Sequence, residues 1–150
     1  MSTTFTIQPG QFKLADLRAI WQQPFKLALA ESAYAAINES SATIDRIVAK
    51  GDAAYGINTG FGKLAKTRIP DEDLELLQKN LILSHSVGSG ELIADEVVRL
   101  IIAMKIASLA RGFSGIRASV IDTMIAAYNA GIMPAIPVKG SVGASGDLAP

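Results

Sequence analysis

Three consecutive residues near the end of the chain, Ala144, Ser145 and Gly146, could build a reactive group from the backbone itself. In a tightly bent chain the amide nitrogen of Gly146 can attack the carbonyl carbon of Ala144, and loss of water closes a five-membered ring. Loss of the Ser145 hydroxyl as a second water leaves an exocyclic methylene. The small Ala allows the approach, Ser supplies the leaving group and Gly tolerates the bend. The product would be a strong electrophile, which no ordinary side chain provides.

A bare Ala-Ser-Gly tripeptide also fits a plainer interpretation. A glycine-rich loop that turns into a helix can hold an anion at the helix amino terminus. The segment lacks the Gly-Lys-Ser/Thr ending of a Walker-type phosphate loop, so nucleotide binding of that kind is not supported. The tripeptide alone favours the loop, and only its longer context, residues 140–150, favours the electrophile.

The second candidate for chemistry is Tyr55, which opens the segment Tyr-Gly-Ile-Asn-Thr-Gly-Phe-Gly at residues 55–62. Gly56, Gly60 and Gly62 lie too close together for a stable helix, so the segment is predicted to be a loop with unusual backbone freedom. A tyrosine held by such a loop could act as a general base once its phenol is ionised. The alternative is a tyrosine that packs at the edge of a loop.

The third candidate is His85, the single histidine of the chain, within Leu-Ser-His-Ser-Val-Gly at residues 83–88. A lone histidine at a helix end is more often a capping or surface residue than a functional one. By itself the sequence leaves both interpretations open.

The eleven residues 140–150, Gly-Ser-Val-Gly-Ala-Ser-Gly-Asp-Leu-Ala-Pro, resemble the signature of the aromatic amino acid lyase family. The segment at 55–62 resembles the tyrosine loop of the same family, about eighty residues earlier. The resemblance implies that Ala144, Ser145 and Gly146 form the family's methylidene-imidazolone prosthetic group autocatalytically. It also implies that no metal or diffusible cofactor is needed.

The resemblance assigns roles to the other candidates. Tyr55 is implied as the base that removes the β-proton of the substrate, with Asn58 and Gly62 close to the substrate. His85 is implied to face the aromatic ring of the substrate, and a Ser-His pair at this place is similar to the histidine branch of the family. The implied reaction is non-oxidative loss of ammonia from L-histidine, which gives trans-urocanate. Ser86 and Val87 differ from the Ser-His-Ala-Ala-Gly motif of that branch, so the packing at the helix end is not predicted.

Family enzymes are homotetramers that build each site from several subunits, and this chain is similar to only the amino-terminal portion of one subunit. Closure of the ring needs a strained backbone that the surrounding structure must hold. We therefore expect the isolated 150-residue chain to keep an ordinary peptide at 144–146 and to be inactive. Alternatives are a tyrosine or phenylalanine lyase, an aminomutase that re-adds the ammonia, or a non-catalytic helical fragment that serves as an assembly module.

The composition excludes several other classes of protein. Fourteen basic and fourteen acidic residues cancel, which argues against nucleic acid or an anionic membrane as a partner. The chain has no cysteine, which suits a cytoplasmic protein, and its first ten residues do not resemble a signal peptide. Hydrophobic residues make up 49% and the mean hydropathy is +0.31, so an oligomer or a larger assembly is expected.

The hydrophobic periodicity predicts a mainly α fold, the helical amino-terminal domain of the lyase fold, as a single domain over 1–150. A short strand is expected around Phe5 and Ile7, and a longer helix from about Ser32 to Lys50. Further expected elements are a helix at 14–21, a helix opened by the acidic run at 71–73, an apolar helix at 97–110 capped by Asp95, and a helix capped by Ser114 that reaches residue 128.

Overall fold

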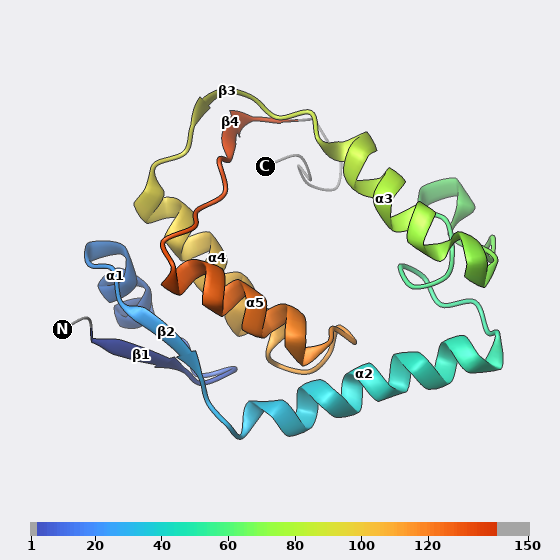
Figure 1. Cartoon of the computed structure of the whole chain (residues 1–150), viewed down its shortest axis with the longest axis horizontal. Helices are drawn as coiled ribbons and strands as arrows, with labels where there is room; N and C mark the ends of the chain where they lie inside the picture. The colour runs from blue at the N-terminus through green and yellow to red at the C-terminus, as the bar shows by residue number, and fades with distance from the viewer. Residues whose placement is uncertain (1–2, 141–150) are drawn as a thin grey trace. The chain divides into compact units, whose positions relative to one another are not determined.

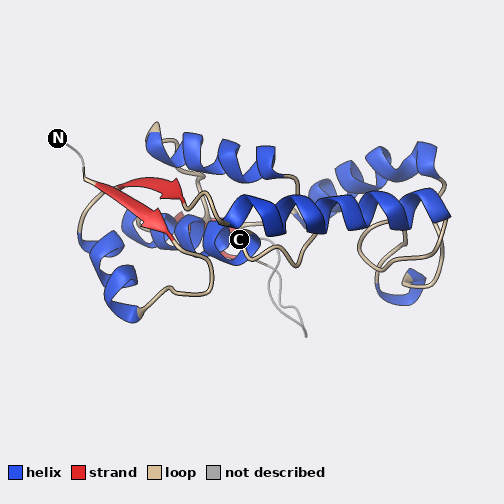
Figure 2. Ribbon diagram, turned by 90° about the horizontal axis from the view of Figure 1, so that it is seen from below, coloured by secondary structure: helices blue, strands red, loops and turns tan. Residues whose placement is uncertain are grey.

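The computed structural model describes residues 3–140 of the chain. Within this range the fold is mainly α, as predicted, with short strands between the helices (Figures 1 and 2). The elements in chain order are β1 (Thr4–Ile7), α1 (Leu14–Gln22), β2 (Lys26–Leu29), α2 (Ala33–Lys50), η1 (Gly62–Leu64), η2 (Asp71–Asp73), α3 (Leu74–His85), β3 (Ser89–Leu92), α4 (Asp95–Leu109), α5 (Ala118–Asn129) and β4 (Pro137–Lys139).

The chain divides into two compact units. Unit 1 comprises Met1–Thr43 and Ile93–Ala135, and unit 2 comprises Ile44–Leu92 and Ile136–Pro150. The single domain expected over the whole chain stays a prediction, and each unit is described by itself below.

Unit 1 begins with two parallel strands joined by a helix. β1 pairs with β2, with Thr4 opposite Lys26 and Ile7 opposite Leu29, and α1 makes the crossover that parallel strands require. The strands lie side by side in Figure 2. The Asn129 side chain fastens β2 to the end of α5, because its amide accepts a hydrogen bond from the Leu27 N–H (2.7 Å) and donates one to the Leu27 carbonyl (2.8 Å).

The core of unit 1 is aliphatic. The helices and strands bury side chains at the spacings that the sequence predicts, and α1 and α5 both pack against α4. The buried cluster consists of Ile7, Ile20, Leu27, Ala33, Ile37, Ala103, Ile106, Ala107, Ala110, Ile121 and Tyr128. Two helix starts differ from the expectation. Ala94 rather than Asp95 precedes α4, and α5 begins at Ala118, so Ser114 lies in the preceding loop and caps nothing.

Unit 2 holds α3 and a small antiparallel ribbon. β3 pairs with β4, with Ser89 opposite Lys139 and Leu92 opposite Pro137. A Cβ on Gly88 would lie 2.8 Å from the Pro137 ring, so glycine lets the two segments approach closely. The sequence did not predict β2, β3 or β4. No helix in residues 3–140 is both long enough and apolar enough to cross a membrane.

Candidate active site

The electrophile residues themselves lie outside the part of the chain that the structure describes, which ends at Gly140. Ala144, Ser145 and Gly146 therefore have no structural account. The structure does describe the segment that precedes them, which includes β4 (Pro137–Lys139). β4 ends at Lys139, and its pairing with β3 holds that end beside Ser89, four residues after His85. The segment that leads to the electrophile string thus lies next to the segment that leaves His85.

Tyr55 lies in a turn of unit 2, and its side chain is 64% exposed. Its ring packs edge-on against Phe61, with 5.7 Å between the ring centroids and 66° between the ring planes. Gly56 has φ +79° and Gly62 has φ +58°, a backbone region that side chains other than glycine rarely adopt. The two glycines therefore let the chain fold back so that Phe61 meets Tyr55. No role was predicted for Phe61, although its place directly between Gly60 and Gly62 in the loop is a usable signal.

Asn58 is fully buried, and both ends of its side-chain amide bind within the loop itself. Its Oδ1 accepts a hydrogen bond from the Ala54 N–H at 2.8 Å, and its Nδ2 donates to the Asp52 carbonyl at 2.9 Å. Its own carbonyl accepts the Ile69 N–H at 2.8 Å. Asn58 is thus the residue that holds the turn carrying Tyr55. Its direct contact with a substrate stays a prediction.

The loop closes on itself through a short bridge between Thr59 and Arg68. The Gly60 N–H donates to the Thr67 carbonyl at 3.1 Å, and Thr59 is buried like Asn58. A Cβ on Gly60 would lie 2.4 Å from that of Leu64, which leaves no room for a side chain there. Gly62, in contrast, is exposed and begins η1, with open space around its Cα.

His85 is the last residue of α3 and is half-buried. Its Nδ1 lies 2.8 Å from the Leu81 carbonyl and 3.1 Å from the Ser84 hydroxyl. A carbonyl can only accept, so Nδ1 carries the proton of the neutral ring and Nε2 is left as an acceptor. Within residues 3–140, no hydrogen bond or ring contact joins His85 to Tyr55 or Asn58. The described residues also contain no cluster of three or more His, Asp or Glu side chains that could hold a metal ion.

Comparison with known proteins decides the family. The family model of aromatic amino acid lyases matches residues 12–150. The chain belongs to the aromatic amino acid lyase family. Enzymes of this family use the methylidene-imidazolone group, so the resemblance of residues 140–150 and 55–62 to its motifs is confirmed at the level of the family.

Individual proteins of this lyase family are similar to the chain in sequence and in structure. The chain is 60% identical to histidine ammonia-lyase of Salmonella typhimurium over 147 residues, which are 98% of this chain and 29% of that protein. The crystal structure of histidine ammonia-lyase from Trypanosoma cruzi has a TM-score of 0.84 at 36% identity, over 98% of this chain and 28% of that one. Phenylalanine aminomutase from Pantoea agglomerans has a TM-score of 0.83 at 31% identity, over 99% of this chain and 29% of that one. The chain therefore spans about 29% of the length of the curated relatives that it matches.

Proposed function

We propose that this chain is the amino-terminal part of a histidine ammonia-lyase, which converts L-histidine into trans-urocanate and ammonia without oxidation. The observation that carries the proposal is the 60% identity, over 98% of the chain, to Salmonella proteins of that name. Among the solved structures, the histidine ammonia-lyase from Trypanosoma cruzi is 36% identical and the aminomutase 31%. The Ser-His pair at residues 84–85 supports the same choice.

The residues of the chain fit the prosthetic group of the family. Ala144, Ser145 and Gly146 are the three residue types that the ring closure needs, in the required order. When formed, the group supplies an electrophile that makes the amino group of the substrate a leaving group. We propose that the ring forms only when the rest of the subunit holds the tripeptide in a bent, strained conformation.

In this proposal Tyr55 removes the β-proton of L-histidine through its phenolate oxygen. The β-hydrogen is only weakly acidic, so the base must be positioned and the site kept dry. The Phe61 ring and the Asn58 amide fix the turn that presents Tyr55. Because Tyr55 is 64% exposed, further polypeptide has to cover it before the elimination can run. Assembly into a homotetramer, in the cytoplasm, is part of the proposal.

His85 would select the imidazole substrate. The Leu81 carbonyl fixes the proton on Nδ1, so Nε2 is free to accept a hydrogen bond from the imidazole N–H of L-histidine. A site that places a polar acceptor against the substrate ring discriminates against rings that cannot pair with it. A phenol hydroxyl could also donate to Nε2, so a tyrosine substrate is the alternative that this geometry leaves.

A chimeric subunit tests the function. In it, this chain replaces the matching portion of the Salmonella typhimurium enzyme, whose remaining sequence supplies the rest of the subunit. We expect urocanate, observed by its ultraviolet absorbance, from L-histidine, and no cinnamate-type product from L-tyrosine or L-phenylalanine. A β-amino acid product would instead assign an aminomutase, and a folded tetramer without any turnover would assign a non-catalytic module.

A further inference from the structure

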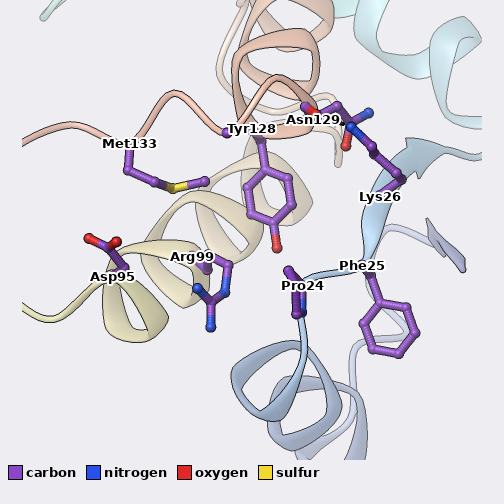
Figure 3. Close-up of a pocket in the computed structure, with 9 residues that line it drawn as sticks. Pro24, Phe25, Lys26, Asp95, Arg99, Tyr128, Asn129 and Met133 are labelled. Carbon is purple, nitrogen blue, oxygen red and sulfur yellow. Dashed lines mark hydrogen bonds between the residues drawn. The ribbon is translucent and has the colours of Figure 1, made fainter. Parts of the chain in front are cut away.

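A cavity of about 320 Å³ lies within unit 1, apart from every residue named for the elimination (Figure 3). Its walls come from α4, α5 and the segment just before β2. Pro24 and Met133 contribute apolar surface, whereas Arg99 and Tyr128 contribute polar groups. The two polar groups are the reason to assign a ligand to it.

Tyr128 is 4% exposed, and its hydroxyl is buried without a hydrogen-bond partner. Burial raises the pKa of Tyr128, and the positive charge of Arg99 offsets part of that rise. Figure 3 shows the hydroxyl directed into the region between Arg99 and Pro24. A buried hydroxyl without a partner destabilises a fold. The phenol of Tyr128 therefore remains available as a donor.

Arg99 is also short of partners. Its Nε is buried and unpartnered, and its Nη2 donates only to the Trp21 carbonyl, at a long 3.3 Å. No described carboxylate forms a salt bridge with Arg99, although Asp95 lies one helical turn before it on α4. The Arg99 side chain as a whole is only half-buried, but a buried polar atom such as this Nε is normally hydrogen-bonded. The Nε of Arg99 and the hydroxyl of Tyr128, both buried without a partner, are a donor set for an anion.

We propose that Arg99 and Tyr128 bind the carboxylate group of a small molecule in this cavity. The guanidinium offers parallel N–H donors that match the two oxygens of a carboxylate, and the phenol adds a third donor. Both unpartnered atoms are closed to solvent, so the Arg99 and Tyr128 side chains have to shift toward the cavity before a ligand can contact them. The energetic cost of this movement is offset because binding supplies hydrogen-bond partners to Arg99 Nε and to the Tyr128 hydroxyl.

Asp95 restricts the ligand to one negative charge. It lines the same cavity one helical turn before Arg99, and its carboxylate repels a second anionic group. The Lys26 ammonium, on another wall, already donates to the Asn129 carbonyl. A monocarboxylate with a small apolar body, which Pro24 and Met133 can contact, is therefore favoured over a dicarboxylate.

The test is an NMR titration of the Arg99 Nε–H signal with sodium propionate, against sodium chloride at the same ionic strength of about 0.15 M. We expect a saturable shift with propionate and none with chloride. Tyr128→Phe keeps the apolar ring but removes one donor to a charged acceptor, and it should weaken propionate binding about tenfold. Asp95→Asn should increase the affinity for succinate more than the affinity for propionate.

Arg99→Lys removes the observed signal, so its effect is read as the loss of propionate-dependent thermal stabilisation. Arg117→Lys, an exposed arginine outside the cavity, is the matched control and should keep that stabilisation. An unsaturable shift, an equal shift with chloride, or unchanged affinity in Tyr128→Phe would overturn the assignment. So would an Arg99 signal that is already hydrogen-bonded and insensitive to propionate, because the occupant would then be water or a protein carboxylate.

Discussion

Asn58, which is predicted to lie close to the substrate, binds within its own loop through its side-chain amide. Its amide binds the Ala54 N–H and the Asp52 carbonyl at a position with no solvent exposure. Asn58→Ala leaves both groups without that partner, and we expect a loss of about 2 kcal/mol in the stability of the loop. Hydrogen exchange at the Ala54 and Ile69 amides should accelerate accordingly.

The control for this loop is Asn80→Ala, which changes an exposed asparagine on α3 in the same unit. It should leave exchange in the loop unchanged. Equal protection of Ala54 in the Asn58→Ala variant and the parent would show that the amide does not hold the turn.

Tyr34 offers a residue-scale prediction in unit 1 that depends on pH. Its hydroxyl donates to Asp122 Oδ1 at 2.6 Å, and this hydrogen bond to a carboxylate is the largest cause that raises the pKa of Tyr34 to about 12. A raised pKa means that the protonated phenol stabilises the fold. The contribution is complete below the unfolded pKa of about 10 and is lost as the pH rises through about 12.

Tyr34→Phe should therefore lower the free energy of unfolding by about 1 kcal/mol near neutral pH, a partly exposed hydrogen bond to a charged acceptor. Denaturant melts from pH 7 to pH 12 should show this difference shrink above pH 10. A difference that stays constant across the range would contradict the assignment of the bond.

At the scale of elements, two glycines that follow helices give a matched pair. Gly112 follows α4 with φ +75°, and Gly131 follows α5 with φ +76°. A Cβ on Gly112 would lie 2.7 Å from the backbone of Ala36, whereas a Cβ on Gly131 would have nothing within 4 Å. The backbone strain is the same at both positions, and only Gly112 adds a steric conflict.

Gly131→Ala should thus cost about 1 kcal/mol of unfolding free energy, and Gly112→Ala about 2 to 4 kcal/mol. Urea denaturation of both variants measures the difference. Equal losses would mean that α2 is not packed against the end of α4 as the structure has it.

Elements that depend on local patterns could be predicted from the sequence, and elements that depend on distant pairing could not. The apolar spacing in 33–50 and the β-branched alternation around Phe5 and Ile7 act locally, so α2 and β1 could be predicted. β2, β3 and β4 are three or four residues long and exist because a distant segment pairs with them. Tyr55 and Asn58 could be predicted as site residues from the glycine-rich segment 55–62. The hydrogen bonds of Asn58 within the loop could not, because they depend on how the loop closes.

At the scale of the whole molecule, apolar side chains remain exposed in each unit. Ile101 and Met104 on α4 and Leu76, Ile82 and Leu83 on α3 are 42–67% exposed. Contiguous exposed apolar surface marks interaction sites in soluble proteins. We propose that further sequence of the subunit, or neighbouring subunits, covers these side chains; the chain spans about 29% of the length of its curated relatives.

Formation of the prosthetic group can be followed by the mass of the whole chain. Intact mass spectrometry should find the chimeric subunit lighter by two waters than its sequence mass, and the isolated 150-residue chain at its full sequence mass. Ser145→Ala in the chimera removes the leaving hydroxyl and should prevent the second dehydration. Loss of two waters from the isolated chain would show that residues 1–150 alone impose the strain that the ring needs.

We propose that this chain supplies the base and the electrophile of a histidine elimination. The most direct test is the rate of urocanate formation by the chimera with and without Tyr55→Phe, because general bases contribute about 10² to 10⁴ in rate. We predict a fall of that size in kcat for Tyr55→Phe and little change for Tyr34→Phe, the control tyrosine. Full activity in Tyr55→Phe, or no urocanate from the parent chimera, would contradict the account.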